Sequence, residues 1–254
     1  MSTAYPILEH DPTLEAVIEP KRLVKPLDVP EHCVVCFFND VLTRLRRQLK
    51  ARVVAKQRSE IGQHPLYEIK FKRQRLAVLH PGVGAPLAVS LLEAVIARGC
   101  RKFIACGGCG VLDRDIAVGH LIVPTSAVRD EGTSYHYLPP GREVSASAEA
   151  VAAIEQTLKN NNVAHLLGKT WTTDAPYRET PEKIKRRRAE GCVTVEMEAA
   201  ALFAVAQFRG VTLGQILYGG DDVSGLEWDH RDWHKQTAVR EKLFWLAAEA
   251  CLAL

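Results

Sequence analysis

Two carboxylates lie close together in the segment Val195-Glu196-Met197-Glu198, which joins an apolar stretch to an alanine-rich run. Because Glu196 and Glu198 are two residues apart, both side chains point to the same side of an extended backbone. Each carboxylate could accept two hydrogen bonds from the vicinal hydroxyls of a ribose, and Met197 would supply an apolar floor under the sugar. The alternative is helix capping, since acidic residues stabilise a helix N-terminus. The spacing alone leaves both interpretations open.

Two glycine-rich segments follow apolar stretches: His80-Pro81-Gly82-Val83-Gly84-Ala85-Pro86 and Cys106-Gly107-Gly108-Cys109-Gly110. Glycine turns after strands bring backbone N–H groups close to a ligand and often direct a helix N-terminus at an anion. Both turns therefore suit phosphate. The alternative is that the glycines only permit tight packing of strand against helix.

A second pair of acids, Asp221 and Asp222, follows an apolar stretch and the pair Gly219-Gly220. Burial beside a flat, apolar ligand raises the pKa of a carboxyl group, which could then protonate a leaving group. Alternatively, either residue could cap the turn that precedes Val223-Ser224-Gly225.

The elements that would position these residues alternate between strand and helix. Apolar runs bounded by glycine predict a βαβ unit, with strands at 76–79 and 102–105 and a helix at 87–98. Further strands are predicted at 33–38, 121–124, 194–196 and 214–218, and further helices after residue 38, at 148–160, after residue 198 and at the C-terminus. The C-terminal helix carries a core-facing stripe that includes Val239, Leu243, Leu246 and Ala250. The pattern predicts a sheet with helices on its faces.

The composition fits one enzyme domain. With 254 residues, 47% hydrophobic, the chain can bury one large core, so we expect an N-terminal arm at 1–30 and a single domain at 31–254. No apolar stretch approaches the length of a membrane span and no signal peptide is recognised, which predicts a cytoplasmic protein without a membrane partner. A net charge of +3 is too small to indicate a nucleic-acid partner.

The cysteines do not predict a metal site. Cys33 and Cys36 lie on a predicted strand, where positions three apart face opposite sides, and Cys106 and Cys109 lie in the glycine-rich segment. Seven cysteines scattered through apolar segments indicate buried, reduced thiols. The basic run at 185–188 follows a helix start at Thr180 and is expected on a solvated helical face.

These segments, with Arg129-Asp130-Glu131-Gly132-Thr133-Ser134 and Gly219-Gly220-Asp221-Asp222, resemble landmarks of the nucleoside phosphorylase family, in family order, across roughly residues 30 to 250. The resemblance implies a single-domain, three-layer α/β/α fold with a central mixed, largely parallel sheet. It implies phosphorolysis of a purine or pyrimidine nucleoside to free base and (deoxy)ribose 1-phosphate. Inorganic phosphate would be the co-substrate, with no metal and no organic cofactor. A homo-oligomer, as dimer, trimer or hexamer, is also implied.

The resemblance assigns roles to matching positions. Glu196, Met197 and Glu198 would hold the ribose, and Asp221 would act on the departing base, with Asp222 as its rival. The remaining assignments are phosphate binding by Gly107, Gly108, Cys109 and by Arg58, whose family counterpart reaches in from a neighbouring subunit. Base binding is assigned to Tyr177, Arg178 and Asp222. Arg44 is a further candidate for phosphate, and Arg231 for pairing with Asp221.

The chain departs from the family at four positions. Uridine phosphorylases carry an Arg and a Thr where this chain has Ala105 and Gly108, and they read uracil with a Gln and an Arg where this chain has Thr180 and Glu182. Two alternatives therefore stay open: a phosphate-independent nucleosidase and a non-catalytic nucleoside-binding protein.

Overall fold

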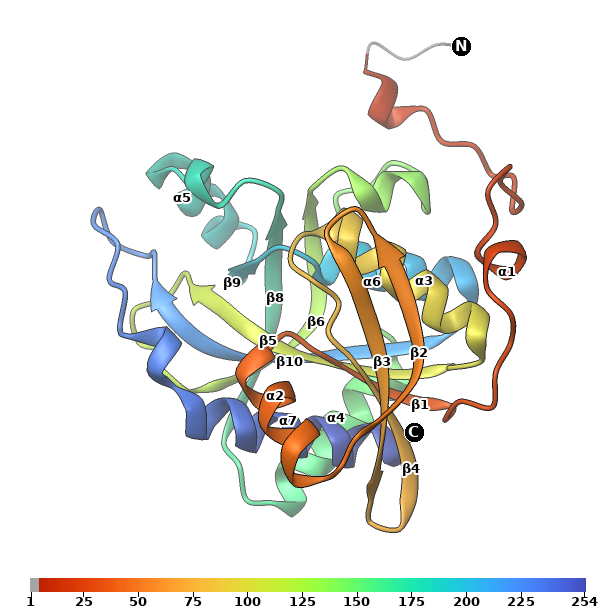
Figure 1. Cartoon of the computed structure of the whole chain (residues 1–254). Helices are drawn as coiled ribbons and strands as arrows, with labels where there is room; N and C mark the ends of the chain where they lie inside the picture. Colours follow the sequence, from red (N-terminus) through yellow and green to blue (C-terminus); the bar gives the residue numbers. More distant parts are fainter. Residues whose placement is uncertain (1–4) are drawn as a thin grey trace.

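The structure is a computed structural model that describes residues 5–254, and its ten strands form one mixed sheet (Figure 1). The strands are β1 (His32–Cys36), β2 (Arg52–Ser59), β3 (Gly62–Phe71), β4 (Gln74–Leu79), β5 (Lys102–Val111), β6 (Leu121–Asp130), β7 (Glu143–Ser145), β8 (His165–Thr173), β9 (Cys192–Glu196) and β10 (Thr212–Asp222). Their order is β10-β6-β8-β9-β5-β1-β4-β3-β2, with β7 beside β6 and with β10 also paired to β5.

This last pairing closes part of the sheet on itself, because β5, β10, β6, β8 and β9 form a ring of neighbours. The predicted mixed α/β fold is confirmed. The sheet is less parallel than expected: five strand pairings are parallel and five are antiparallel.

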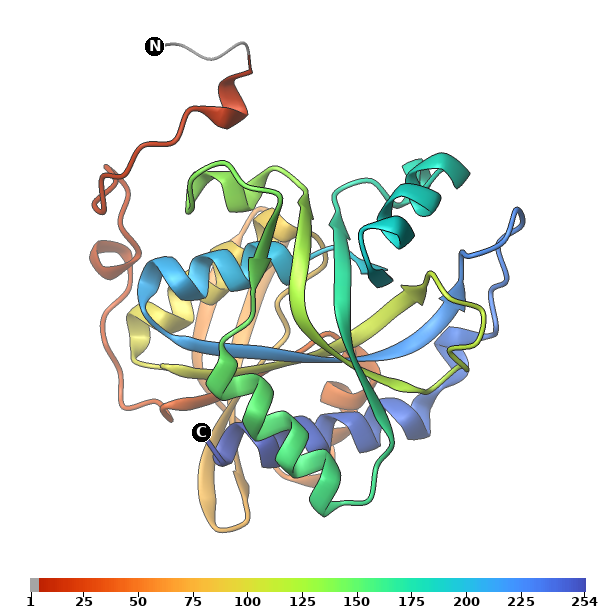
Figure 2. The same cartoon turned by 180° about the vertical axis from the view of Figure 1, so that it is seen from behind.

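Helices cover both faces of the sheet, as Figures 1 and 2 show from opposite sides. The helices are α1 (Pro20–Leu23), α2 (Asn39–Gln48), α3 (Ala85–Arg98), α4 (Ala148–Asn160), α5 (Pro181–Ala189), α6 (Ala199–Arg209) and α7 (Thr237–Leu252), with short 3₁₀ turns at Pro6–Leu8, Thr133–His136, Pro176–Arg178 and Trp233–Lys235. One core holds α3 and α6, and the other holds α2, α4 and α7. The predicted helices are confirmed.

The strand β1 shows how the sequence builds two cores. Cys33 and Val35 pack in the core with α3 and α6, whereas Val34 and Cys36 pack in the core with α2, α4 and α7. The alternation confirms that Cys33 and Cys36 cannot chelate one metal ion. All seven cysteines are free and buried.

Gly107–Gly110 is not a turn, which corrects the sequence-based prediction. The residues continue the extended strand β5, in which Gly107 to Cys109 pair with β10 and Gly110 pairs with Val195 of β9. No helix follows the segment, so it directs no helix N-terminus at a ligand. Glycine at position 110 lets β5 lie close to β9, because a Cβ on Gly110 would lie 3.0 Å from the Val195 side chain.

The antiparallel meander of β2, β3 and β4 extends one edge of the sheet, and β2 and β3 were not predicted. Residues 5–30 form an arm that runs over the side of the molecule near α3 (Figure 2). The arm is tied down where Glu19 pairs with Arg209 of α6, at 3.5 Å. Residues 1–4 of the predicted arm lie outside the described residues. In the described part of the chain, no helix is long and apolar enough to cross a membrane.

Candidate active site

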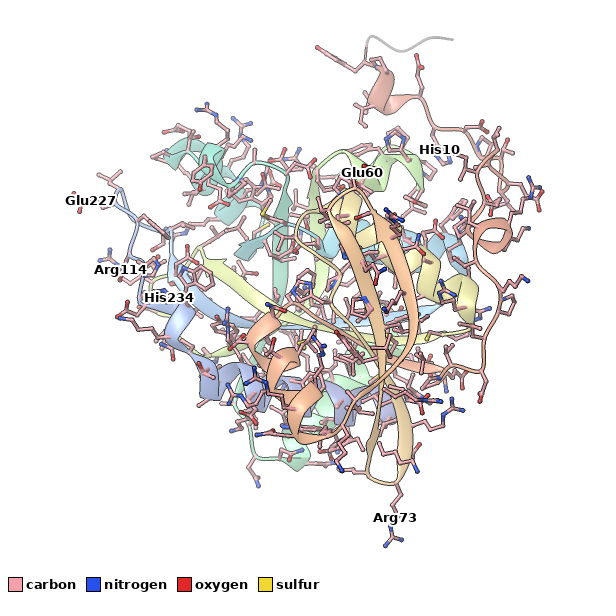
Figure 3. The ribbon with its side chains drawn as sticks, viewed as in Figure 1. His10, Glu60, Arg73, Arg114, Glu227 and His234 are labelled. Carbon is pink, nitrogen blue, oxygen red and sulfur yellow. The ribbon has the colours of Figure 1, made fainter. Side chains whose placement is uncertain are left out.

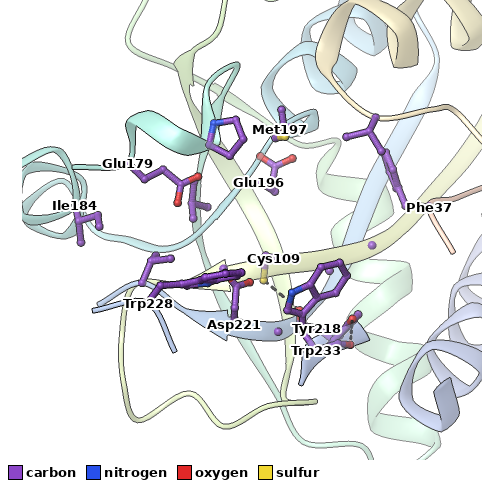
Figure 4. Close-up of a pocket in the computed structure, with 18 of the residues that line it drawn as sticks. Phe37, Cys109, Glu179, Ile184, Glu196, Met197, Tyr218, Asp221, Trp228 and Trp233 are labelled. Carbon is purple, nitrogen blue, oxygen red and sulfur yellow. Dashed lines mark hydrogen bonds between the residues drawn. The ribbon is translucent and has the colours of Figure 1, made fainter. Parts of the chain in front are cut away.

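A cavity of about 760 Å³ opens beyond the carboxyl ends of β1, β5, β9 and β10, the edge at which open α/β sheets bind ligands (Figure 4). Its walls combine acidic, aromatic and glycine residues. The lining includes Phe37, Phe38, Gly107, Gly108, Cys109, Tyr177, Glu179, Glu196, Met197, Glu198, Gln215, Tyr218, Asp221, Glu227, Trp228, Trp233 and Arg240. Glu179 and Glu196 lie on one side of the cavity, and Asp221 and Trp228 on the other.

Glu196 caps the helix α6. Its Oε2 accepts hydrogen bonds from the backbone N–H groups of Glu198, at 2.7 Å, and Ala199, at 2.6 Å. Its Oε1 accepts from the Thr172 hydroxyl at 2.6 Å. Burial raises the pKa of Glu196, and these hydrogen bonds oppose the rise. The capping alternative therefore describes Glu196, whose oxygens are already engaged in the structure.

Glu198 can accept more additional hydrogen bonds than Glu196. Its Oε1 accepts from the backbone N–H of Gly84 at 2.5 Å, and the side chain lines the cavity beside Met197. Burial first, and then the charge of Glu196, raise the pKa of Glu198. The turn before α3 thus positions a hydrogen-bond donor for the carboxylate. Gly82 and Gly84 adopt positive φ angles of 78° and 91°, and the Gly84 N–H donates to Glu198.

Asp221 faces the cavity from the end of β10. Its Oδ2 accepts a hydrogen bond from the indole N–H of Trp228 at 2.6 Å. The pKa of Glu179, which also lines the cavity, is raised to about 7 by burial and then by the negative charge of Asp221. The negative charge of Asp221 therefore acts on Glu179 within the cavity where a ligand would bind.

Glu179 was not predicted from the sequence. Its position between Arg178 and the helix N-cap Thr180, in a segment already assigned to the base side, was the available signal. The resemblance assigns base binding to Arg178 instead. The structure leaves Arg178 exposed and outside the cavity lining.

Asp222 points away from the cavity, because consecutive residues of a strand face opposite sides. It accepts hydrogen bonds from the Ser224 N–H at 2.7 Å and from the Arg231 guanidinium at 2.8 Å. Burial tends to raise the pKa of Asp222, but the Ser224 hydrogen bond and the Arg231 charge outweigh it and lower the pKa. The prediction that Arg231 pairs with Asp221 is wrong, and Asp222 has the turn-capping role instead of a place in the lining.

The other predicted residues are divided between the cavity and the surface. Gly107, Gly108 and Cys109 line the cavity, and Tyr177 stands at its rim with 98% of its surface exposed. Arg58 is exposed on β2, near the turn to β3 that carries Glu60, and is outside the lining (Figure 3). Arg44 pairs with Glu241 of α7 at 2.5 Å and also lies outside it.

One group of side chains could hold a metal ion. Ligand atoms of His230, Asp232 and His234 lie within 4.8 Å of one another, on the segment between β10 and α7. None of the three lines the cavity. The group is partly engaged, since Asp232 pairs with Lys235 at 3.1 Å.

The family model that matches this chain and its curated relatives indicate the same family. The family model "Phosphorylase superfamily" matches residues 31–252. Guanosine phosphorylase of Halorubrum lacusprofundi is 34% identical over 145 residues, which cover 56% of this chain and 58% of that protein. The chain spans about three fifths of the length of the curated relatives it matches, 58%, 59% and 62% for three of them.

Two solved structures share the fold. Uridine phosphorylase of Vibrio fischeri superposes with a TM-score of 0.73 at 23% identity, covering 89% of this chain and 91% of that one. AMP nucleosidase of Bacteroides thetaiotaomicron superposes with a TM-score of 0.72 at 21% identity, covering 90% of each chain. At these identities the likeness concerns the fold.

Proposed function

Because the chain belongs to the phosphorylase superfamily, we propose that it is a nucleoside phosphorylase that cleaves the N-glycosidic bond of a purine nucleoside. Inorganic phosphate attacks C1′ of the sugar, the bond to the base breaks, and the products are free base and (deoxy)ribose 1-phosphate. The observation that carries the proposal is a single cavity lined by Glu198 and Met197 and, on opposite sides, by Glu179 and Asp221. The reaction as proposed uses no metal and no organic cofactor.

The sugar is held by Glu198. Its carboxylate keeps one oxygen on the Gly84 N–H and has remaining lone pairs for the vicinal hydroxyls of a ribose. Glu196 acts on the sugar through Glu198, because it receives the Glu198 backbone N–H and holds the start of α6 in place. Met197 provides the apolar contact to the carbon face of the sugar.

The base is held by Asp221 and Glu179, which favours a purine. The base leaves more readily when a proton or hydrogen bond neutralises the charge that develops on it, and Asp221 is placed on the cavity wall to provide this. Glu179, with its pKa raised to about 7, can present either a donor or an acceptor to the base near neutral pH. One relative is a guanosine phosphorylase, which agrees with this choice.

A second function, phosphate-independent hydrolysis, is favoured by one observation. Ala105 and Gly108 offer no cation or hydroxyl for phosphate, and a water molecule as nucleophile needs neither. The fold likeness to an AMP nucleosidase is compatible with this reaction.

The test is base release from inosine, guanosine, adenosine and uridine, each with and without inorganic phosphate, with sugar 1-phosphate measured beside free base. We expect phosphate-dependent release with a preference for a purine nucleoside. Glu198→Gln should lower kcat/KM at least about a hundredfold, because an amide replaces the carboxyl group that accepts hydrogen bonds from the ribose hydroxyls. Glu155→Gln, on the distant helix α4, is the control.

Release of base without phosphate would identify a nucleosidase. Tight binding without any release would instead identify a nucleoside-binding protein. A Glu198→Gln variant with unchanged kcat/KM would rule out the ribose assignment.

A further inference from the structure

The cavity is strongly acidic. Five carboxyl side chains line it: Glu179, Glu196, Glu198, Asp221 and Glu227. Among the described residues of the lining, Arg240 is the one Arg or Lys. An anionic co-substrate is repelled by carboxylates and needs a positive charge close by, so the position of this single guanidinium decides where an anion can bind.

Arg44 and Arg58, the other candidates for a contact with phosphate, lie outside the cavity lining. Arg44 is paired with Glu241 at 2.5 Å on the outer side of α2 and α7. Arg58 is exposed on β2 and outside the lining. Ala105, where a family Arg would stand, has no polar side chain and packs in the apolar core with α3 and α6.

Arg240 is held in a defined orientation on the first turn of α7. Its guanidinium lies 5.1 Å from the centre of the Phe38 ring and 5.8 Å from that of Trp233. Its Nη1 donates to Asp40 Oδ1 at 3.1 Å, and the side chain is 15% exposed. These cation–π contacts and the Asp40 hydrogen bond restrain the guanidinium at the cavity wall.

One donor of Arg240 is unused. The Nε is buried and has no hydrogen-bond partner among the described residues. A guanidinium has five N–H donors in a fixed fork, and a buried donor without an acceptor costs free energy. An oxyanion in the cavity would satisfy such a group, and bidentate contact with phosphate is the geometry that arginine favours.

Gly108 and Tyr218 link Arg240 to the glycine segment of β5. A Cβ on Gly108 would lie 3.1 Å from Cε1 of Tyr218, so the Tyr218 ring uses the space that a side chain at 108 would need. The Tyr218 hydroxyl donates to the backbone carbonyl of Trp233 at 3.1 Å. Burial raises the pKa of Tyr218, and the nearby charge of Arg240 works against the rise. Arg240 is therefore beside the part of the cavity assigned to phosphate.

We infer that Arg240 supplies the cationic contact to the phosphate nucleophile, in place of the side chains missing at Ala105 and Gly108. The inference rests on the proposed phosphorylase function. Asp40 competes with phosphate for the same guanidinium, so it limits the affinity of the site.

The test measures phosphate KM at saturating nucleoside, and nucleoside KM at saturating phosphate, in wild type and four variants. Arg240→Gln should raise phosphate KM about tenfold or more and leave nucleoside KM within about twofold, because a charge-assisted contact to phosphate is lost. Arg240→Lys should give an intermediate phosphate KM. Asp40→Asn should lower phosphate KM, since it removes a competing negative charge, whereas a merely structural role for the pair predicts no improvement. Arg44→Gln, which breaks a neighbouring ion pair outside the cavity, is the matched control.

The outcomes separate the inference from the function on which it rests. If wild type requires phosphate but phosphate KM is unchanged in Arg240→Gln, the inference is overturned and the proposed function stands. If Arg240→Gln fails to fold, Arg240→Lys and Asp40→Asn decide, and unchanged phosphate KM in both overturns the inference. If wild type releases base without phosphate, the proposed function fails. Thermal shift with inorganic phosphate against chloride then decides: a shift in wild type that Arg240→Gln loses supports the anion site, and equal shifts reject it.

Discussion

In each pair of acids, one member is held by hydrogen bonds from the turn beside it, and the other keeps more hydrogen-bonding capacity for a ligand in the cavity. Glu196 receives two backbone N–H groups and the Thr172 hydroxyl, while Glu198 keeps free lone pairs. Asp222 receives the Ser224 N–H, while Asp221 lines the cavity. Burying a carboxylate is costly unless it is hydrogen-bonded, so the tied member stabilises the turn that aims its neighbour at a ligand.

Glu179 should make stability depend on pH. Its pKa rises from 4.5 to about 7 on folding, so between these values the native state holds a proton that the unfolded state has lost. The native state is thus favoured below pH 4.5, and this contribution is lost as pH rises through 7. Glu179→Gln removes the contribution. We expect the Tm of the variant, relative to wild type, to rise from pH 5 to pH 8 in a thermal unfolding series.

Glu182→Gln is the control for this prediction, because Glu182 is an exposed neighbour on α5. Its Tm should follow that of wild type at every pH. Parallel curves for Glu179→Gln and wild type would mean that Glu179 is an ordinary, ionised carboxylate in the native state.

The helices and strands approach each other closely where the chain has glycine. The strand β10 packs closely against α4 at Gly214. On β5, the Tyr218 side chain from the neighbouring strand lies close to Gly108. The alanine-rich start of α6 is completely buried for the same reason, since small side chains let the helix lie close to the sheet. Of these close contacts, the one between Gly108 and Tyr218 lies at the cavity, because both residues line it.

Gly214→Ala should destabilise the protein. The new Cβ would lie 2.8 Å from the Ala150 Cβ and 3.1 Å from the Ile154 Cδ1, so α4 would have to move away from β10. We expect the free energy of unfolding, measured by urea denaturation, to fall by about 1–3 kcal/mol.

The matched control is Gly132→Ala, where the nearest atoms to a Cβ are 3.8 Å away and the φ of −88° suits alanine. Its free energy of unfolding should change by less than about 0.5 kcal/mol. Equal stability of Gly214→Ala and wild type would show that α4 can shift without cost.

Several large apolar side chains are exposed at places outside the cavity. Val17 of the arm is 95% exposed, and Ile61 at the turn between β2 and β3 is 75% exposed. The arm with His10 and the segment with Glu227 and His234 lie on opposite sides of the molecule (Figure 3). We propose a homo-oligomer, as the family resemblance implies, in which Arg58 would reach the cavity of a neighbouring subunit.

Subunit mixing tests the role of Arg58. Arg58→Gln and Glu198→Gln should each have low activity, and co-refolding them in equal amounts should restore about a quarter of wild-type activity in a dimer, because half of the sites in mixed dimers have both native residues. Light scattering would give the oligomeric state. Activity no higher than the average of the two parent variants, or a monomer in solution, would exclude a contribution of Arg58 from the partner.

Much of the architecture could be predicted because its signals are local. The buried strand at Cys33 to Cys36, the helix start at Thr180 and the helix formed by the alanine run after Glu198 are predicted by apolar runs, capping and helical periodicity. The motifs also identified the family, which the match to residues 31–252 confirms. The hairpin of β2 and β3 was missed because its burial is partial and its residues carry charge.

The arrangement around the cavity depended on contacts between distant residues. Arg240 meets Asp40 across 200 positions of the chain, and Glu198 meets Gly84 across 114. No local pattern reports such contacts, because they follow from how the strands pair and the helices pack. The extended Gly107–Gly110 segment, the partner of Arg231 and the face of Asp222 likewise became known only from strand pairing and side-chain direction. The residue types of the site can therefore be predicted from the sequence. Their orientation and their neighbours are set by the folded sheet.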